Sequence, residues 1–217
     1  MEINFIGHSS FKIRGKNVTI ITDPFDKESV GFSYPKTEAD IVTISHEHQD
    51  HKGGLSQIEG NPFVIEGPGE YEIKDVSIFG VPAFHDNSNG QERGKNTIYT
   101  YEVEGLRLCH LGDLGHKLSS STLEELNGVD ILFLPVGGNY TLDPKLASEV
   151  ASQIEPKVTI PMHYQEEGMK PESFAKLAPV TAFLKEIGEQ VAPVPKLVIT
   201  RDKMPEERQI VVLERRG

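Results

Sequence analysis

The sequence His46-Glu47-His48-Gln49-Asp50-His51 decides which fold and chemistry this chain is expected to have. Four of its side chains can bind a metal ion, namely His46, His48, Asp50 and His51. The stretch follows a β-branched run, Asp40–Ser45, and precedes Lys52-Gly53-Gly54. Imidazole nitrogens and carboxylate oxygens suit borderline metals such as zinc when a rigid element holds them close together. The pattern therefore predicts a metal site at the end of a strand.

Three later residues have suitable chemistry at suitable places. His85 follows Phe79–Phe84, Asp113 follows Leu108–Gly112, and His163 follows Val158–Met162. Each stands where a predicted strand opens into a loop, which is where rigid scaffolds present functional groups. We therefore expect them to complete the metal site. His110 and His116 are nearby in the sequence, and either is an alternative to His85 as a ligand.

With these residues in place, the chain resembles the metallo-β-lactamase-fold hydrolases. Their H-x-H-x-D-H signature is complete at His46–His51, and the later ligand positions of the family match the three residues above. More narrowly, the chain is similar to the ascorbate-6-phosphate lactonase-like branch. Phe5–Phe11, Ile21–Phe25 and Pro135–Thr141 carry that similarity. The resemblance extends over roughly residues 3 to 165.

The resemblance implies an α/β fold, a four-layer αβ/βα sandwich of two mixed β-sheets flanked by helices, within one domain over residues 1–217. It implies two divalent metal ions, with zinc expected and manganese or iron as alternatives. The implied ligands of the first ion are His46, His48 and His85. Those of the second ion are Asp50, His51 and His163, and Asp113 would bridge both ions.

Local patterns agree with a layered α/β domain. The expected strands are Glu2–Ile6, Ser10–Arg14, Val18–Thr22, Ile41–Ser45, Phe63–Ile65, Val76–Val81, Thr97–Val103, Leu106–Cys109, Ile131–Leu134, Val158–Ile160, Lys196–Thr200 and Gln209–Leu213. Ser121-Thr122-Leu123-Glu124 matches a capping box that opens a short helix. Asp143-Pro144 places an N-cap before proline at the start of a second helix, and a third carries Phe183, Leu184 and Ile187. Residues 86–96 are polar and predict a loop.

Composition limits the class of protein. The chain has 217 residues, 37% of them hydrophobic, which is enough for one sizeable core. Its net charge of −11 argues against broad nucleic-acid binding, which needs a basic face. No apolar run of about 18 residues is present, so no membrane span is expected. The start of the chain shows no signal peptide, and the single cysteine, Cys109, excludes an internal disulfide; both favour a cytoplasmic location.

The expected activity is hydrolysis of an ester, lactone or phosphodiester, because a metal pair lowers the pKa of water and stabilises the attacking and leaving oxygens. Its net positive charge favours a small anionic substrate. Asp50 is expected to orient the attacking water, and His8 or His116 to donate a proton to the leaving group. Asp23 is expected to accept a hydrogen bond from a ligand histidine. Tyr140 or Tyr164 is expected to hydrogen-bond to an anionic substrate.

Three other functions compete with this hypothesis. A nuclease or phosphodiesterase acting on RNA or DNA is the main alternative, opposed by the acidic charge. A di-iron oxidoreductase is opposed by His48, because such relatives commonly have Glu at this position and an attached flavin domain. A metal-binding protein without turnover is opposed by the presence of all seven ligand types. Neither the substrate nor the assembly into homo-oligomers follows from the sequence.

Overall fold

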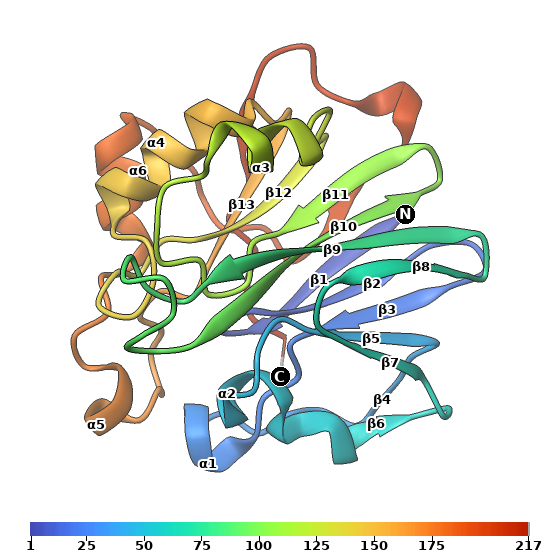
Figure 1. The fold of residues 1–217 in the computed structure, drawn as a ribbon, viewed down its shortest axis with the longest axis horizontal. Coiled ribbons are helices and arrows are strands. Elements are labelled where there is room, and N and C mark those ends of the chain that lie inside the picture. Colours follow the sequence, from blue (N-terminus) through green and yellow to red (C-terminus); the bar gives the residue numbers. More distant parts are fainter. Residues whose placement is uncertain (217) are drawn as a thin grey trace.

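Two β-sheets pack face to face and carry helices on their outer sides (Figure 1). The computed structural model describes residues 1–216, apart from the side chains of Pro171 and Ser173. The six-stranded sheet has the order β14 (Leu197–Val198), β1 (Glu2–Gly7), β2 (Ser10–Arg14), β3 (Thr19–Thr22), β5 (Ile41–Ile44) and β7 (Phe63–Glu66). Strands β3, β5 and β7 run parallel to one another, so their carboxyl ends share one edge.

The seven-stranded sheet has the order β15 (Gln209–Ile210), β13 (Val158–Met162), β12 (Ile131–Pro135), β11 (Leu106–His110), β10 (Lys95–Val103), β9 (Val76–Phe84) and β8 (Gly69–Ile73). Strands β11, β12, β13 and β15 are parallel. A small third sheet pairs β4 (Thr37–Glu38) with β6 (Ile58–Glu59). Strands β5, β12 and β13 are buried along their whole length because both of their faces are covered, which explains their continuous apolar sequences.

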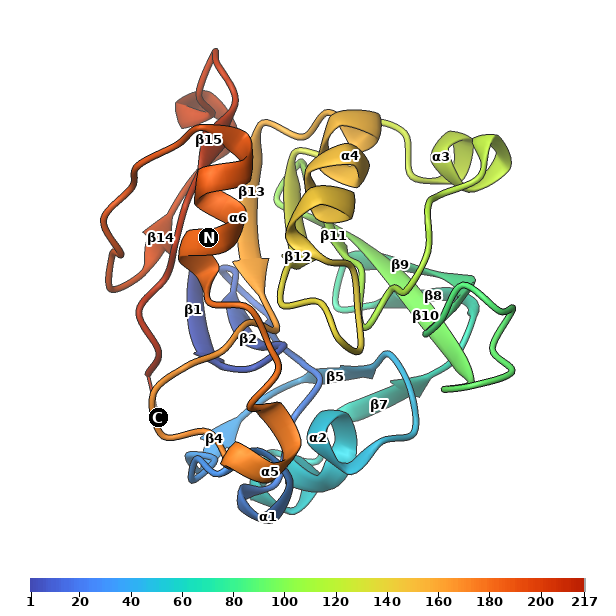
Figure 2. The ribbon, with the colours of Figure 1, turned by 90° about the vertical axis from the view of Figure 1, so that its left-hand side faces the viewer.

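Helices form the two outer layers (Figures 1 and 2). Helices α3 (Ser120–Glu125), α4 (Pro144–Ile154) and α6 (Val180–Ile187) lie beside the seven-stranded sheet, and α1 (Lys27–Val30), α2 (Gln49–Lys52) and α5 (Pro171–Phe174) lie beside the other. Short 3₁₀ turns occupy Gly53–Gln57 and Arg201–Lys203. This arrangement confirms the predicted αβ/βα sandwich. No helix within residues 1–216 is both long and apolar enough to cross a bilayer.

The main core fills the space between the sheets. Phe11 of one sheet contacts Phe133 of the other, with ring centroids 4.5 Å apart. Tyr101 and Thr43 form a buried hydrogen bond of 2.6 Å between their hydroxyl oxygens, again from opposite sheets. Cys109 lies in this core and is fully buried. The packing fixes the two sheets relative to each other, and therefore the groups at their shared edge.

Several predicted boundaries need correction. Ser119 caps α3, because its side chain accepts a hydrogen bond of 3.1 Å from the Thr122 N–H, so the cap lies two residues before the predicted Ser121. The last two strands are shorter than predicted and cover only Leu197–Val198 and Gln209–Ile210. Strand β8 is not among the expected strands, although Tyr71 and Ile73 alternate with two glutamates, because glycine and glutamate are residue types depleted in strands. The cap at Asp143 and the helix through Phe183 are confirmed.

Candidate metal centre

The seven predicted ligands come together where strands of both sheets end. His46, His48, Asp50 and His51 follow β5 and continue into α2. His85 follows β9, Asp113 follows β11, and His163 follows β13. The carboxyl ends of parallel strands meet at one edge of a sheet, so residues far apart in the sequence become neighbours there. The structure thus brings the seven together from both sheets.

The first cluster contains His46, His48 and His85. Each offers a ring nitrogen, and the three nitrogens lie within 4.8 Å of one another. His46 Nε2 is 3.1 Å from His48 Nδ1, and the ring centroids of His46 and His85 are 4.7 Å apart. Burial lowers the pKa of His46 well below its usual value, and His51 lowers it further. The ring is therefore neutral, as a metal ligand must be.

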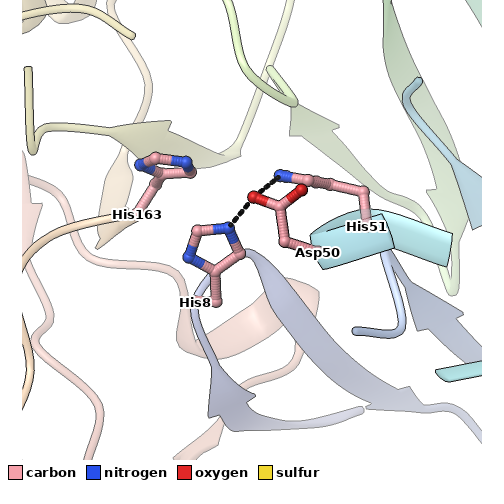
Figure 3. Close-up of side chains that lie close together, drawn as sticks. All are labelled: His8, Asp50, His51 and His163. Atoms are coloured by element: carbon pink, nitrogen blue, oxygen red, sulfur yellow. Dashed lines mark hydrogen bonds and ion pairs between the residues drawn. The ribbon is translucent and has the colours of Figure 1, made fainter. Parts of the chain in front are cut away.

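The second cluster contains Asp50, His51 and His163, with His8 beside them (Figure 3). His51 Nε2 is 3.7 Å from Asp50 Oδ2, and His8 Nε2 is 3.2 Å from the same oxygen. The ring centroids of His8 and His163 are 4.2 Å apart. His8 is fully buried, and burial followed by repulsion from His163 lowers its pKa to about 4. His8 is therefore a neutral ring behind the Asp50 carboxylate.

Asp113 joins the two clusters. Its Oδ2 atom lies close to four histidine Nε2 atoms, at 3.1 Å from His163, 3.2 Å from His85, 3.3 Å from His51 and 3.9 Å from His46. Burial alone would raise the pKa of this carboxyl, but the surrounding histidines, His163 first, hold it well below its usual value. An ionised carboxylate between two imidazole clusters stands where a bridging ligand would be required.

The buried polar atoms fit metal ions. Asp113 Oδ1 and His51 Nε2 are buried and make no hydrogen bond within residues 1–216, and such groups are costly without a partner. Ligands held ~2.0–2.2 Å from a tetrahedral ion lie ~3.3–3.6 Å apart. The four contacts around Asp113 Oδ2, at 3.1 to 3.9 Å, lie around this spacing. A cation at each cluster would satisfy the unpaired atoms, so the donor set fits a binuclear site.

Asp23 orients His51 from the side away from Asp113. The Asp23 Oδ2 atom is 2.9 Å from His51 Nδ1, so the ring donates from Nδ1 and turns Nε2 towards the cluster. Ser45 fixes the carboxylate in turn, donating from its backbone N–H and its hydroxyl, each at 2.7 Å. Burial opposes ionisation of Asp23, but His51 lowers the pKa of Asp23 below its usual value. The hydrogen bond that the sequence predicted for Asp23 is present.

Asn96 and Gly112 stabilise the turn that carries Asp113, and the sequence analysis did not identify either residue. Asn96 accepts a hydrogen bond of 3.0 Å from the Asp113 N–H, and its side-chain amide donates to the Leu111 carbonyl at 2.9 Å. Gly112 has a φ of +56°, and a Cβ there would lie 2.6 Å from the Ser45 Cβ. Glycine is therefore needed at this turn, because Ser45 leaves no room for a side chain. Only tertiary contacts identify Asn96, since a lone Asn at the start of a strand has no distinctive local pattern.

The two alternative ligands, His110 and His116, do not reach the clusters. His110 Nε2 lies 2.9 Å from the Ser9 carbonyl oxygen, and its Nδ1 accepts a hydrogen bond from the Gly112 N–H at 3.1 Å. His116 Nε2 accepts from the Phe84 N–H at 3.2 Å, and its Nδ1 donates to the carbonyl of the next residue at 2.8 Å. Both rings use both nitrogens on the backbone, so the structure leaves His85 at the ligand position.

A cavity of about 370 Å³ opens over the clusters. Its lining residues are Ser29, His48, Asp50, His85, Arg93, Asp113, Tyr140, His163 and Phe174. Neither His8 nor His116, the predicted proton donors, belongs to this lining. Tyr140 lines the cavity, but Tyr164 is buried beside Phe5 and does not. A small molecule in this cavity would therefore meet Asp50 and Tyr140 but would not meet Tyr164.

Comparison with known proteins agrees with this geometry. Residues 2–163 match the family model of the β-lactamase superfamily domain. A UPF0173 metal-dependent hydrolase from Thermococcus onnurineus is 31% identical over 206 residues, covering 82% of this chain and 92% of that protein. A crystal structure from Thermotoga maritima, assigned as a Zn-dependent hydrolase of the metallo-β-lactamase superfamily, is 40% identical and covers 99% of both chains with a TM-score of 0.82.

More distant structures share the fold alone. The short form of human tRNase Z is 12% identical, with a TM-score of 0.56 over 76% of this chain and 93% of that one. At this identity, the likeness says nothing about substrate. The family match and the first two relatives have much higher identity or coverage than this structure. They confirm the predicted superfamily and enzyme class. This chain belongs to the metallo-β-lactamase superfamily and, within it, to the UPF0173 family of metal-dependent hydrolases.

Proposed function

We propose that this chain holds two divalent metal ions and hydrolyses an ester, lactone or phosphodiester bond in a small anionic molecule. The observation that carries the proposal is the position of Asp113 Oδ2 between the two histidine clusters. His46, His48 and His85 would hold one ion, and Asp50, His51 and His163 the other, with Asp113 shared. Zinc suits this nitrogen-rich donor set and is named for the Thermotoga maritima relative; manganese and iron are the alternatives.

When bound, such a metal pair lowers the pKa of water and stabilises charge on the reacting oxygens. The protein's own groups position the reactants. Asp50 lines the cavity, with its side chain 20% exposed, so it is placed to accept a hydrogen bond from the attacking water. His8 touches Asp50 from the buried side and supports that carboxylate. This position differs from that of a proton donor, which would need to meet the substrate in the cavity.

The cavity and its charge support a small anionic substrate. A volume of about 370 Å³ accommodates a metabolite-sized molecule. Two divalent ions would outweigh the charges of Asp50 and Asp113, so the centre would attract negative groups despite the acidity of the whole chain. The similarity of the sequence to the ascorbate-6-phosphate lactonase-like branch points to the same substrate class. Nothing in the described cavity favours the nuclease alternative, which would need a basic groove.

The test begins with metal analysis of the purified protein and continues with turnover of bis(p-nitrophenyl) phosphate and a panel of lactones. His48→Ala and Asp113→Ala should lose metal and at least about 100-fold in kcat/KM, because each removes a ligand. His116→Ala serves as a matched control, since both of its ring nitrogens hydrogen-bond to backbone groups outside the clusters. Full turnover in both ligand variants would refute the proposed centre.

A further inference from the structure

One positively charged side chain lines the cavity over the candidate metal centre. Arg93 is the only lysine or arginine among the described residues that line it. Its side chain is 34% exposed, and its nearest acidic group is Glu92, whose carboxylate oxygen lies 3.6 Å away and is itself 60% exposed. An exposed ion pair of this kind contributes little and is readily exchanged. The guanidinium is therefore accessible to a bound anion.

The backbone around Arg93 is fixed by a single buried carboxylate. Asp86 accepts four backbone hydrogen bonds, from Ser88 at 2.8 Å, Gly90 at 2.9 Å, Glu92 at 3.0 Å and Arg93 at 2.8 Å. Burial opposes ionisation, but these donors outweigh it and lower the pKa of Asp86 to about 2. The loop from the end of β9 to the start of β10 is consequently closed on itself. The loop begins at His85, so the same set of hydrogen bonds positions both this candidate ligand and Arg93.

Two aromatic rings, Phe174 and Tyr140, lie between the candidate metal centre and Arg93. The Phe174 ring lies 6.3 Å from the His163 ring, and the Tyr140 ring lies 6.3 Å from Phe174 at an interplanar angle of 87°. The Arg93 guanidinium carbon is 5.7 Å from the centre of the Tyr140 ring. Cation–π contact of this kind orients the planar guanidinium without using its N–H donors. Those donors remain available to a ligand.

We propose that Arg93 binds an oxyanion of the substrate, a carboxylate or a phosphate that is separated from the scissile bond by a short spacer. The guanidinium suits either group because it donates two parallel hydrogen bonds to a pair of oxygens. The spacer would lie along Phe174 and Tyr140 while the scissile group reaches Asp50 and the ligands. The inference rests on the proposed hydrolysis for the reacting end, and adds the residue that selects the other end.

The experiment compares two aryl esters with the same leaving group, the neutral 4-nitrophenyl acetate and the anionic 4-nitrophenyl hydrogen succinate, on metal-loaded protein. Arg93→Met should lower kcat/KM for the anionic ester about 10- to 100-fold and leave the neutral ester within about twofold, as expected for loss of a charge-assisted bidentate contact. Lys95→Met is the matched control. It removes the same charge two residues further along, at the first residue of β10, but Lys95 lines a neighbouring hollow and not this cavity.

Calorimetric titration provides a second readout that needs no turnover. Succinate and glycerol 3-phosphate, titrated separately, distinguish the carboxylate from the phosphate, with acetate as the short reference anion. At least one should bind the wild type and Lys95→Met about 10-fold more tightly than it binds Arg93→Met. Such binding without hydrolysis would refute the proposed function and retain the role of Arg93. Equal losses in Arg93→Met and Lys95→Met, or equal losses for both esters, would overturn the role of Arg93 and leave the hydrolase intact.

Discussion

Glu166 gives the sharpest test of the electrostatics around this site. Its side chain is only 12% exposed; one oxygen accepts a hydrogen bond of 3.2 Å from the His8 N–H, and the other lies 3.5 Å from Arg215. Burial raises the pKa of this carboxyl from 4.5 to about 7, against the lowering effect of its two partners. The folded protein therefore retains a proton that the unfolded chain releases at lower pH.

The sign and size of the effect follow from linkage. Between pH 4.5 and 7 the folded state binds more protons than the unfolded state, so this group lowers stability as the pH rises. Below pH 4.5 the carboxyl is protonated in both states, so it does not lower the unfolding free energy. Above pH 7 the cost is complete, and a shift from 4.5 to about 7 corresponds to about 3 kcal/mol. Glu166→Gln removes the titration, so its unfolding free energy should gain about that amount relative to wild type across the window.

Urea unfolding at a series of pH values from 4 to 8 measures this difference. The histidines titrate in both proteins, so their contribution cancels when the two curves are subtracted. Glu167→Gln is the matched control, because its side chain is exposed, and its difference curve should stay flat. A difference curve for Glu166→Gln that is equally flat would refute the reasoning, whatever constant offset the amide introduces.

Three further predictions concern the metal centre. Asp23→Asn should weaken metal binding about 10- to 100-fold in calorimetry, because His51 loses the acceptor that fixes its tautomer; unchanged affinity would contradict this role. Gly112→Ala should lower the unfolding free energy by about 2 kcal/mol or more, since the new Cβ meets Ser45 at a positive φ; thermal unfolding would show it. His116→Gln should keep its metal content and its kcat within about twofold in elemental analysis and assays, and loss of one metal equivalent would restore His116 as a ligand.

The candidate ligands could be predicted because most of them are marked by local sequence patterns. His46–His51 is dense, and the strands before it and before Asp113 and His163 are β-branched or apolar runs whose ends can be located in the sequence. Helix α4 was predictable for a similar reason, since Asp143 caps it and proline follows. These features depend on neighbouring residues, and tertiary contacts did not override them.

The remainder of the site depends on contacts between distant segments. His8 and His116 were equivalent candidates in the sequence, yet one lies against Asp50 and the other against the backbone of Phe84. Arg93 is one charged residue in a polar loop, and its place at the cavity follows from the four hydrogen bonds to Asp86. Nothing local distinguishes such residues from solvated ones.

The candidate ligands belong to both halves of the sandwich: the group after β5 extends from one sheet, and those after β9, β11 and β13 extend from the other. Ions held between them would add their binding free energy to the docking of one half on the other. Removal of the metal would then shorten the lifetime of the folded protein as well as abolish its catalytic activity.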